Sequence, residues 1–104
     1  MATYLMLFRT TQQGGQKMEE APARIQAAKE LCRSLGGEVK QFLFLLGQYD
    51  AAFTLEAPND ETAARIALAI GARGNVVTET LRAFTETEFK ELVAKLPEPG
   101  GQPR

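Results

Sequence analysis

Four polar side chains in this chain are candidates for chemistry. Tyr49 and Asp50 interrupt the most apolar stretch, 43–53, and Glu79 and Arg82 lie in a segment rich in Val and Thr. In a functional site at the mouth of a cleft, Asp50 would act as a base or an orienting acceptor, and Tyr49 as a hydrogen-bond donor. In a structural role, Asp50 would bond the amides of a turn and Tyr49 would pack its ring.

Glu79 is predicted to share one face of a strand with the apolar side chains at positions 77, 81 and 83. A carboxylate on an apolar face needs a partner or has a raised pKa. Because Arg82 points to the opposite face, the predicted partner is another residue such as Arg9. Two interpretations stay open: an ion pair or hydrogen bond inside a dimer contact, and an acid or base of a site.

Histidine is absent and there is one cysteine, Cys32, which excludes many kinds of site. Zinc, copper, iron–sulfur and most haem sites use histidine or several cysteines, and Ser–His or Cys–His nucleophiles need histidine. The sequence therefore predicts no metal and no cofactor. Cys32 is predicted to be an inert core thiol on an apolar helix face, because a reactive thiol would need a lowered pKa and access to solvent.

The net charge and the hydropathy pattern exclude several classes of binding partner. The chain has 104 residues and a net charge of -1, from 12 basic and 13 acidic side chains. This balance gives no basic field for nucleic acid and no basic amphipathic segment for an anionic membrane. No apolar run approaches the roughly 20 residues of a membrane span, and the N-terminus does not resemble a signal peptide. We therefore expect a cytoplasmic protein, and a lone cysteine agrees with a reducing compartment.

The hydrophobic pattern predicts seven elements. Strands, where apolar, aromatic and β-branched residues gather, are expected at 3–9, 38–46, 51–57 and 75–84. Helices, each with an apolar face at helical spacing, are expected at 22–35, about 59–73 and 85–96. The inner face of the last helix is expected to be Phe89, Leu92, Val93 and Leu96. Residues 1–96 then form one domain, and the Pro- and Gly-rich residues 97–104 form a disordered tail.

The order of these elements predicts an α+β, ferredoxin-like βαββαβ fold. It has a four-stranded antiparallel sheet with two helices on one face, plus a C-terminal helix. The first two strands are apolar on both of their faces. Because so large an apolar patch is unfavourable on a soluble monomer, we expect a second copy of the chain to cover the free face. The expected partner is the chain itself, as a homodimer or higher homo-oligomer.

Several stretches also resemble a known family. The chain is similar to the GYD domain family in residues 1–4, in 46–50 with 56–60 after it, and in 74–84, and these stretches are spread over most of 1–96. The family is named for Gly-Tyr-Asp, and here Gln48 stands between Gly47 and the pair Tyr49 and Asp50. The resemblance implies a ferredoxin-like fold of the dimeric α/β-barrel type, and hence oligomerisation, but no particular chemistry.

We therefore expect a homo-oligomeric binding or assembly module with a small-ligand cleft between sheet and helices. The alternative is a cofactor-independent isomerase or oxygenase that acts on a small organic acid or quinone-like compound, by analogy with other proteins of this fold type. Its catalytic residues would come from Tyr49, Asp50, Glu79 and Arg82. The sequence leaves open whether the chain is an enzyme.

Overall fold

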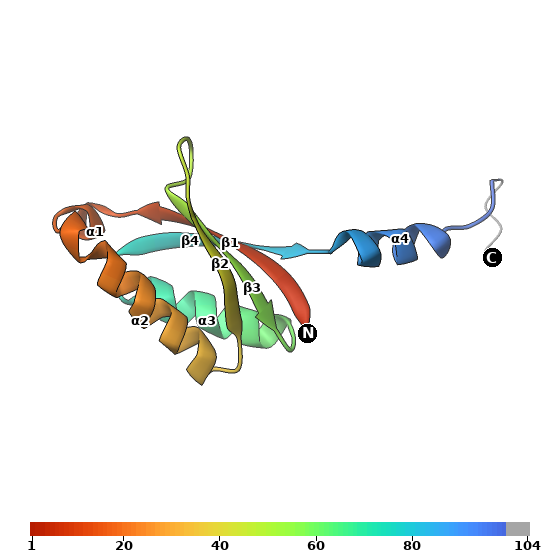
Figure 1. Cartoon of the computed structure of the whole chain (residues 1–104), viewed down its shortest axis with the longest axis horizontal. Coiled ribbons are helices and arrows are strands. Elements are labelled where there is room, and N and C mark those ends of the chain that lie inside the picture. Colours follow the sequence, from red (N-terminus) through yellow and green to blue (C-terminus); the bar gives the residue numbers. More distant parts are fainter. Residues whose placement is uncertain (100–104) are drawn as a thin grey trace.

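One of the two inner strands of the sheet is β1 (Ala2–Thr10) in the computed structural model, which describes residues 1–99 (Figure 1). β1 pairs antiparallel with β3 (Ala51–Ala57) on one side and with β4 (Val76–Ala83) on the other. β2 (Glu38–Phe44) pairs antiparallel with β3, which gives the order β2-β3-β1-β4. The predicted four-stranded antiparallel sheet is therefore confirmed over the described residues.

Two helices cover one face of this sheet. They are α2 (Ala21–Ser34) and α3 (Asp60–Ala72), which lie on the same side of the sheet in Figure 1. The segment before α2 forms the short helix α1 (Gln12–Gly15) and the 3-10 turn η1 (Met18–Glu20), and α4 (Glu86–Ala94) follows β4. The ferredoxin-like βαββαβ arrangement is confirmed, and α1 and η1 are added to it.

The hydrophobic core lies between the sheet and these two helices. Alternate residues of β1, Tyr4, Met6 and Phe8, are buried on the helix side, and Phe53 and Leu55 of β3 lie beside them. The helices complete the core with small and branched side chains, namely Cys32, Ala63, Ile66 and Ile70. Because successive strand residues point to opposite faces, the remaining side chains of β1 and β3 face away from the helices.

A β-bulge in β2 changes the faces that simple alternation predicts. The pairing of β2 with β3 shifts between Val39 and Gln41, so Val39 pairs with Leu55 and packs against the core together with Phe42. Strict alternation would have placed Val39 on the opposite face from Phe42. The extra residue, Lys40, allows both side chains to reach the helix side.

The other face of the sheet carries no helix formed by residues 1–99, and we call it the open face. Leu5 and Leu7 of β1 lie half-buried on it, paired with Leu81 and Glu79 of β4. Val77 and Leu81 are 61% and 42% exposed. The first strand is therefore apolar on both faces, as predicted. Within the described residues, no part of the chain covers the open face.

The C-terminal helix α4 projects away from the domain (Figure 1). Its N-terminus is capped by Thr85, which forms a capping box with Glu88. The four residues expected to face inward are exposed, however: Phe89, Leu92, Val93 and Leu96. The radius of gyration is 16.7 Å, against about 13 Å for a compact chain of this length. The prediction of inward packing is wrong because the chain continues beyond the sheet after β4, which pairs with β1 as far as Ala83, so α4 does not lie over the domain (Figure 1).

The hairpin between β2 and β3 turns at Gly47, whose φ of +139° is open mainly to glycine. β2 ends at Phe44, earlier than predicted, although the Leu45 amide still donates to the Asp50 carbonyl at 2.9 Å. The tip of this hairpin extends beyond the rest of the sheet in Figure 1.

No helix within residues 1–99 combines the length and the apolar character needed to cross a lipid bilayer. The predicted tail, 97–104, lies for its greater part outside the described residues, so the domain boundary at 96 stays a prediction.

Candidate functional site

Tyr49 and Glu79 meet on the open face. The Tyr49 hydroxyl donates a short hydrogen bond to Oε1 of Glu79, and the Arg9 guanidinium lies over the Tyr49 ring, 5.1 Å from its centroid. Arg9 and Glu79 come from the neighbouring strands β1 and β4. The partner of the Glu79 carboxylate is therefore the tyrosine hydroxyl, where the sequence had suggested Arg9.

Asp50 lies on the other side of the sheet from Tyr49. Its Oδ2 accepts from the Thr10 amide at 2.7 Å, and its own amide donates to the Phe8 carbonyl at 2.8 Å. These two bonds attach the β2–β3 hairpin to the end of β1. Because Asp50 lines a cavity on the helix side of the sheet, whereas Tyr49 bonds Glu79 on the open face, Tyr49 and Asp50 do not form a pair at the mouth of one cleft.

Arg82 is separate from both groups. Its guanidinium lies 5.5 Å from the centroid of the Tyr4 ring and 4.3 Å from that of Phe84, and its Nη1 donates to the Thr3 carbonyl at 3.2 Å. The Tyr4 hydroxyl donates to Oδ1 of Asp60 at 2.6 Å. Burial, and then the Asp60 carboxylate, raise the pKa of Tyr4. The sequence correctly placed Arg82 on the face of the sheet opposite Glu79, but it did not reveal the Tyr4–Asp60 hydrogen bond.

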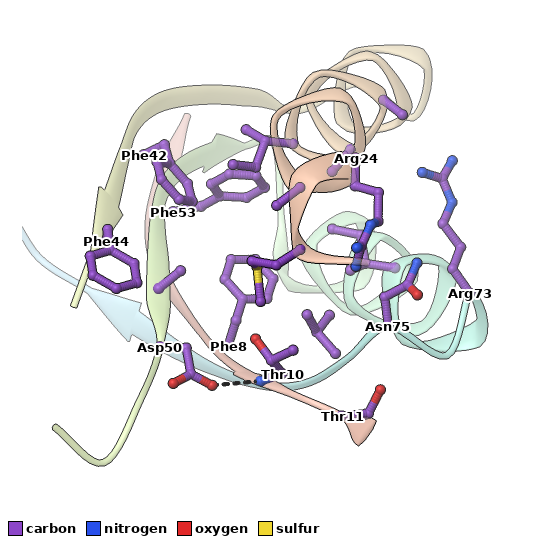
Figure 2. Close-up of a pocket in the computed structure, with 18 of the residues that line it drawn as sticks. Phe8, Thr10, Thr11, Arg24, Phe42, Phe44, Asp50, Phe53, Arg73 and Asn75 are labelled. Carbon is purple, nitrogen blue, oxygen red and sulfur yellow. Dashed lines mark hydrogen bonds between the residues drawn. The ribbon is translucent and has the colours of Figure 1, made fainter. Parts of the chain in front are cut away.

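A cavity of about 500 Å³ lies between α2 and the helix-facing side of the sheet (Figure 2). This volume is within the usual range for small-molecule sites, roughly 300–1,000 Å³. Its walls are mostly apolar, and the larger contributors are Phe8, Met18, Ile25, Phe42, Phe44, Phe53, Ile70 and Val76. Of the four predicted site residues only Asp50 lines it, so the cavity and the Tyr49–Glu79 pair are two distinct places.

The polar end of the cavity is built by α1, η1 and the loop between α3 and β4. Arg24 and Asn75 lie at that end in Figure 2, across the cavity from Phe42 and Phe44, and the Arg73 side chain extends beyond them. Nη1 and Nη2 of Arg24 donate to the carbonyls of Gly14 and Lys17 at 3.0 and 2.5 Å. Arg24 therefore has a fixed position at this end of the cavity.

Sequence reasoning did not identify Arg24 or Arg73. A signal for Arg24 exists: it lies three residues after Ala21 and four before Ala28, so it shares the inner face of α2. Arg73 is the C-terminal cap residue of α3. Nothing in the local sequence shows that it approaches the N-terminal half of the chain.

Gly14 allows α1 to contact the α3–β4 loop. The Thr11 amide donates to the Asn75 carbonyl at 3.0 Å and the Thr11 hydroxyl to the Gly74 carbonyl at 2.6 Å. A Cβ on Gly14 would lie only 2.1 Å from the Asn75 oxygen, whereas a Cβ on Gly15 would have its nearest neighbour at 4.0 Å.

We therefore expect Gly14→Ala to lower the free energy of unfolding by about 2–3 kcal/mol, because α1 must move away from Asn75. Gly15→Ala, its neighbour, should change that free energy by no more than about 0.5 kcal/mol. Urea denaturation of the two variants measures both values. Equal effects of the two substitutions would show that α1 does not pack as closely as described.

Cys32 is fully buried and makes no disulfide in the described part of the chain. Burial raises the pKa of its thiol from 9.0 to about 11. A raised pKa favours the folded state below pH 9, and this contribution is lost as the pH rises toward 11. The prediction of an inert core thiol agrees with this position.

At pH 8 we expect the native thiol to react with a disulfide reagent at least ~100-fold more slowly than the urea-unfolded thiol. The reason is that the raised pKa alone lowers the thiolate fraction by about that factor. Stopped-flow absorbance in the two states gives the rates. A native rate within a few-fold of the unfolded rate would contradict the buried position of Cys32.

The side chains of the Tyr49–Glu79 pair and of the cavity limit the chemistry that each of these two sites can perform. The Tyr49–Glu79 pair can donate or accept a proton on an exposed sheet face, and the cavity can enclose an apolar molecule next to two guanidinium groups. Within residues 1–99, no three His, Cys, Asp or Glu side chains cluster in a way that could hold a metal ion. The predicted site residues thus lie at three places and do not converge on one.

Comparison with known proteins identifies a family and a solved structure that are similar to this chain. The model of the GYD domain family matches residues 4–93. The glutamine synthetase and cystathionine beta-lyase binding protein of Thermus thermophilus is 34% identical over 97 residues, 92% of this chain and 99% of the relative. A crystal structure of a Thermus thermophilus protein superposes with a TM-score of 0.54 at 25% identity, covering 82% of this chain and 95% of that one. Because the family model spans most of the chain, this protein belongs to the GYD domain family.

Proposed function

We propose that the chain is a homo-oligomeric binding module that pairs through its open face and holds a small ligand in its cavity. The observation that carries the pairing is a group of apolar side chains on the open face, where Leu5 and Leu7 lie half-buried beside the exposed Val77 and Leu81. Burying them removes apolar surface from water, at about 25 cal/mol per Å². A second copy presents the same surface and is complementary to it under two-fold symmetry.

The area of the open face alone is smaller than that of a standard stable interface, so we propose that α4 contributes to the contact as well. Four strands about 4.8 Å apart, with a rise of about 3.3 Å per residue, give a face on the order of 500 Å². A standard stable interface buries about 800 Å² on each partner. The exposed apolar residues of α4, which include Phe89 and Leu92, continue directly from β4 and would supply the remainder by lying against the second copy.

The polar side chains of the open face, Arg9, Tyr49 and Glu79, are compatible with burial in an interface. Tyr49 already contacts both Glu79, through its hydroxyl, and Arg9, through its ring, so pairing would not bury either charged side chain without a partner. A hydrogen-bonded group of this kind inside an apolar contact can fix the relative position of the two sheets. This supports the structural interpretation of Glu79.

We further propose that the oligomer binds metabolic enzymes. The support is the name of the relative, a binding protein for glutamine synthetase and cystathionine beta-lyase, together with its alignment over 92% of this chain. A cytoplasmic location belongs to the same proposal, and the single cysteine without a disulfide supports it.

Biolayer interferometry with purified glutamine synthetase and cystathionine beta-lyase from the same organism tests the choice of partner. Saturable binding of at least one enzyme is expected, and a purified enzyme of similar size and charge serves as the control. Failure of both enzymes to bind at tens of micromolar, or equal binding of the control, would contradict this part of the proposal.

The Tyr49–Glu79 hydrogen bond favours one second candidate, a cofactor-independent isomerase or oxygenase. In that case Tyr49→Phe and Glu79→Gln would abolish turnover while the protein stays folded. If instead these variants only weaken self-association, the pair belongs to the interface.

A further inference from the structure

The cavity has two chemically different ends. Its inner part is formed by aromatic and aliphatic side chains, among which Phe8, Phe53 and Ile70 are buried core residues. The rings of Phe42 and Phe53 lie edge to face with centroids 6.0 Å apart. An apolar ligand body is favoured there, because these walls offer it no hydrogen-bond partner.

The opposite end carries an excess of positive charge. Two arginines, Arg24 and Arg73, line it, and among the described residues of the cavity wall Asp50 is the one acidic residue. Oδ2 of Asp50 already accepts from the Thr10 amide. Within residues 1–99, neither guanidinium has a carboxylate oxygen within 4.0 Å. The two cations are therefore not neutralised by ion pairs with described residues.

The Arg24 guanidinium is held in a fixed position and keeps N–H donors with which it can bind an anion. Its contacts with the carbonyls of Gly14 and Lys17 hold the guanidinium in place, and the group has five N–H donors, so donors remain after those two bonds. Thr11 and Asn75 add polar side chains to the cavity wall. A fixed guanidinium in a partly enclosed site binds a carboxylate with strong, charge-assisted hydrogen bonds.

From these two ends we infer that the cavity binds an apolar carboxylate, with its hydrocarbon body among the phenylalanines and its carboxylate on Arg24 and Arg73. The inference rests on the small-ligand part of the proposed function, for which it names the chemical class. It does not depend on pairing of the sheets, because the cavity lies on the helix side and the pairing surface is the open face (Figure 2).

Calorimetric titration with three probes of equal chain length tests the class of ligand. The probes are octanoate, octanol and octylammonium, each added to the full chain at pH 7. Octanoate is expected to bind one site per chain, with octanol at least about tenfold weaker and octylammonium weaker still. Equal affinity for octanoate and octanol would overturn the assignment of an anion while leaving the cavity as an apolar site. Absence of heat with all three probes at two temperatures, which excludes binding whose enthalpy happens to be near zero at one of them, would overturn the small-ligand function as well.

Two arginine variants test the position of the carboxylate. Arg73→Gln should weaken octanoate binding about tenfold and leave octanol binding unchanged, because Arg73 contributes charge to the cavity. Arg33→Gln, an exposed change on the same helix as Arg24, is the matched control and should leave both affinities unchanged. Circular dichroism confirms that each variant is folded. If Arg73→Gln behaves like Arg33→Gln, the carboxylate does not sit at this end of the cavity and the inference is wrong.

Discussion

Leu81→Asp is expected to convert the oligomer into monomers. Leu81 lies on the open face beside Leu5, and is 42% exposed in the single chain, so a charge there remains hydrated in the monomer. In the paired state the same carboxylate would be buried without a partner. We expect the dissociation constant to rise at least ~100-fold, measured by light scattering after size-exclusion chromatography.

The chain provides a matched control for this experiment. Leu68 on α3 is 74% exposed and lies on the helix side of the molecule, away from the open face. Leu68→Asp should leave the mass of the oligomer unchanged. If both variants remain oligomeric, or both dissociate, the open face is not the pairing surface.

Phe53→Ala is expected to destabilise the fold more than any other single change considered. The Phe53 side chain is 2% exposed and lies in the central core, with its ring centroid 4.9 Å from that of Phe8. Its removal leaves a cavity that the β-sheet cannot close, at a cost of about 3–5 kcal/mol. That is a large fraction of the roughly 5–15 kcal/mol that stabilises a domain.

Phe44→Ala is the control for that change. Phe44 is the same residue type on the neighbouring strand, but it is 73% exposed. Its truncation should alter the free energy of unfolding by no more than about 0.5 kcal/mol. Urea denaturation at one fixed protein concentration compares the two, because self-association shifts the apparent stability. Similar midpoints for both variants would contradict the core described for Phe53.

Local patterns predicted most of the fold because each depends on few neighbouring residues. The alternation in β1 places Tyr4, Met6 and Phe8 toward the helices and Leu5 and Leu7 away from them, as found. The bulge at Lys40 could not be predicted in this way, since an inserted residue shifts every later side chain and leaves no mark in the sequence.

The candidate sites depend on contacts between distant parts of the chain, and these were harder to predict. Tyr49 and Glu79 were both candidates, but 30 positions separate them and only the folded sheet brings them together. Arg24 and Arg73 were missed because one lies in α2 and the other at the end of α3. The direction of α4 was predicted wrongly since its amphipathic pattern requires a covering surface but does not say which molecule provides it.

The central claim is that two copies of this chain pair through the open face. Sedimentation velocity of the wild-type chain from 1 to 50 µM, a concentration range on the order of common weak-dimer constants, tests it most directly. We predict a species of at least twice the 11.4 kDa chain mass at the upper end of this range. A single species of 11.4 kDa at every concentration would contradict the claim.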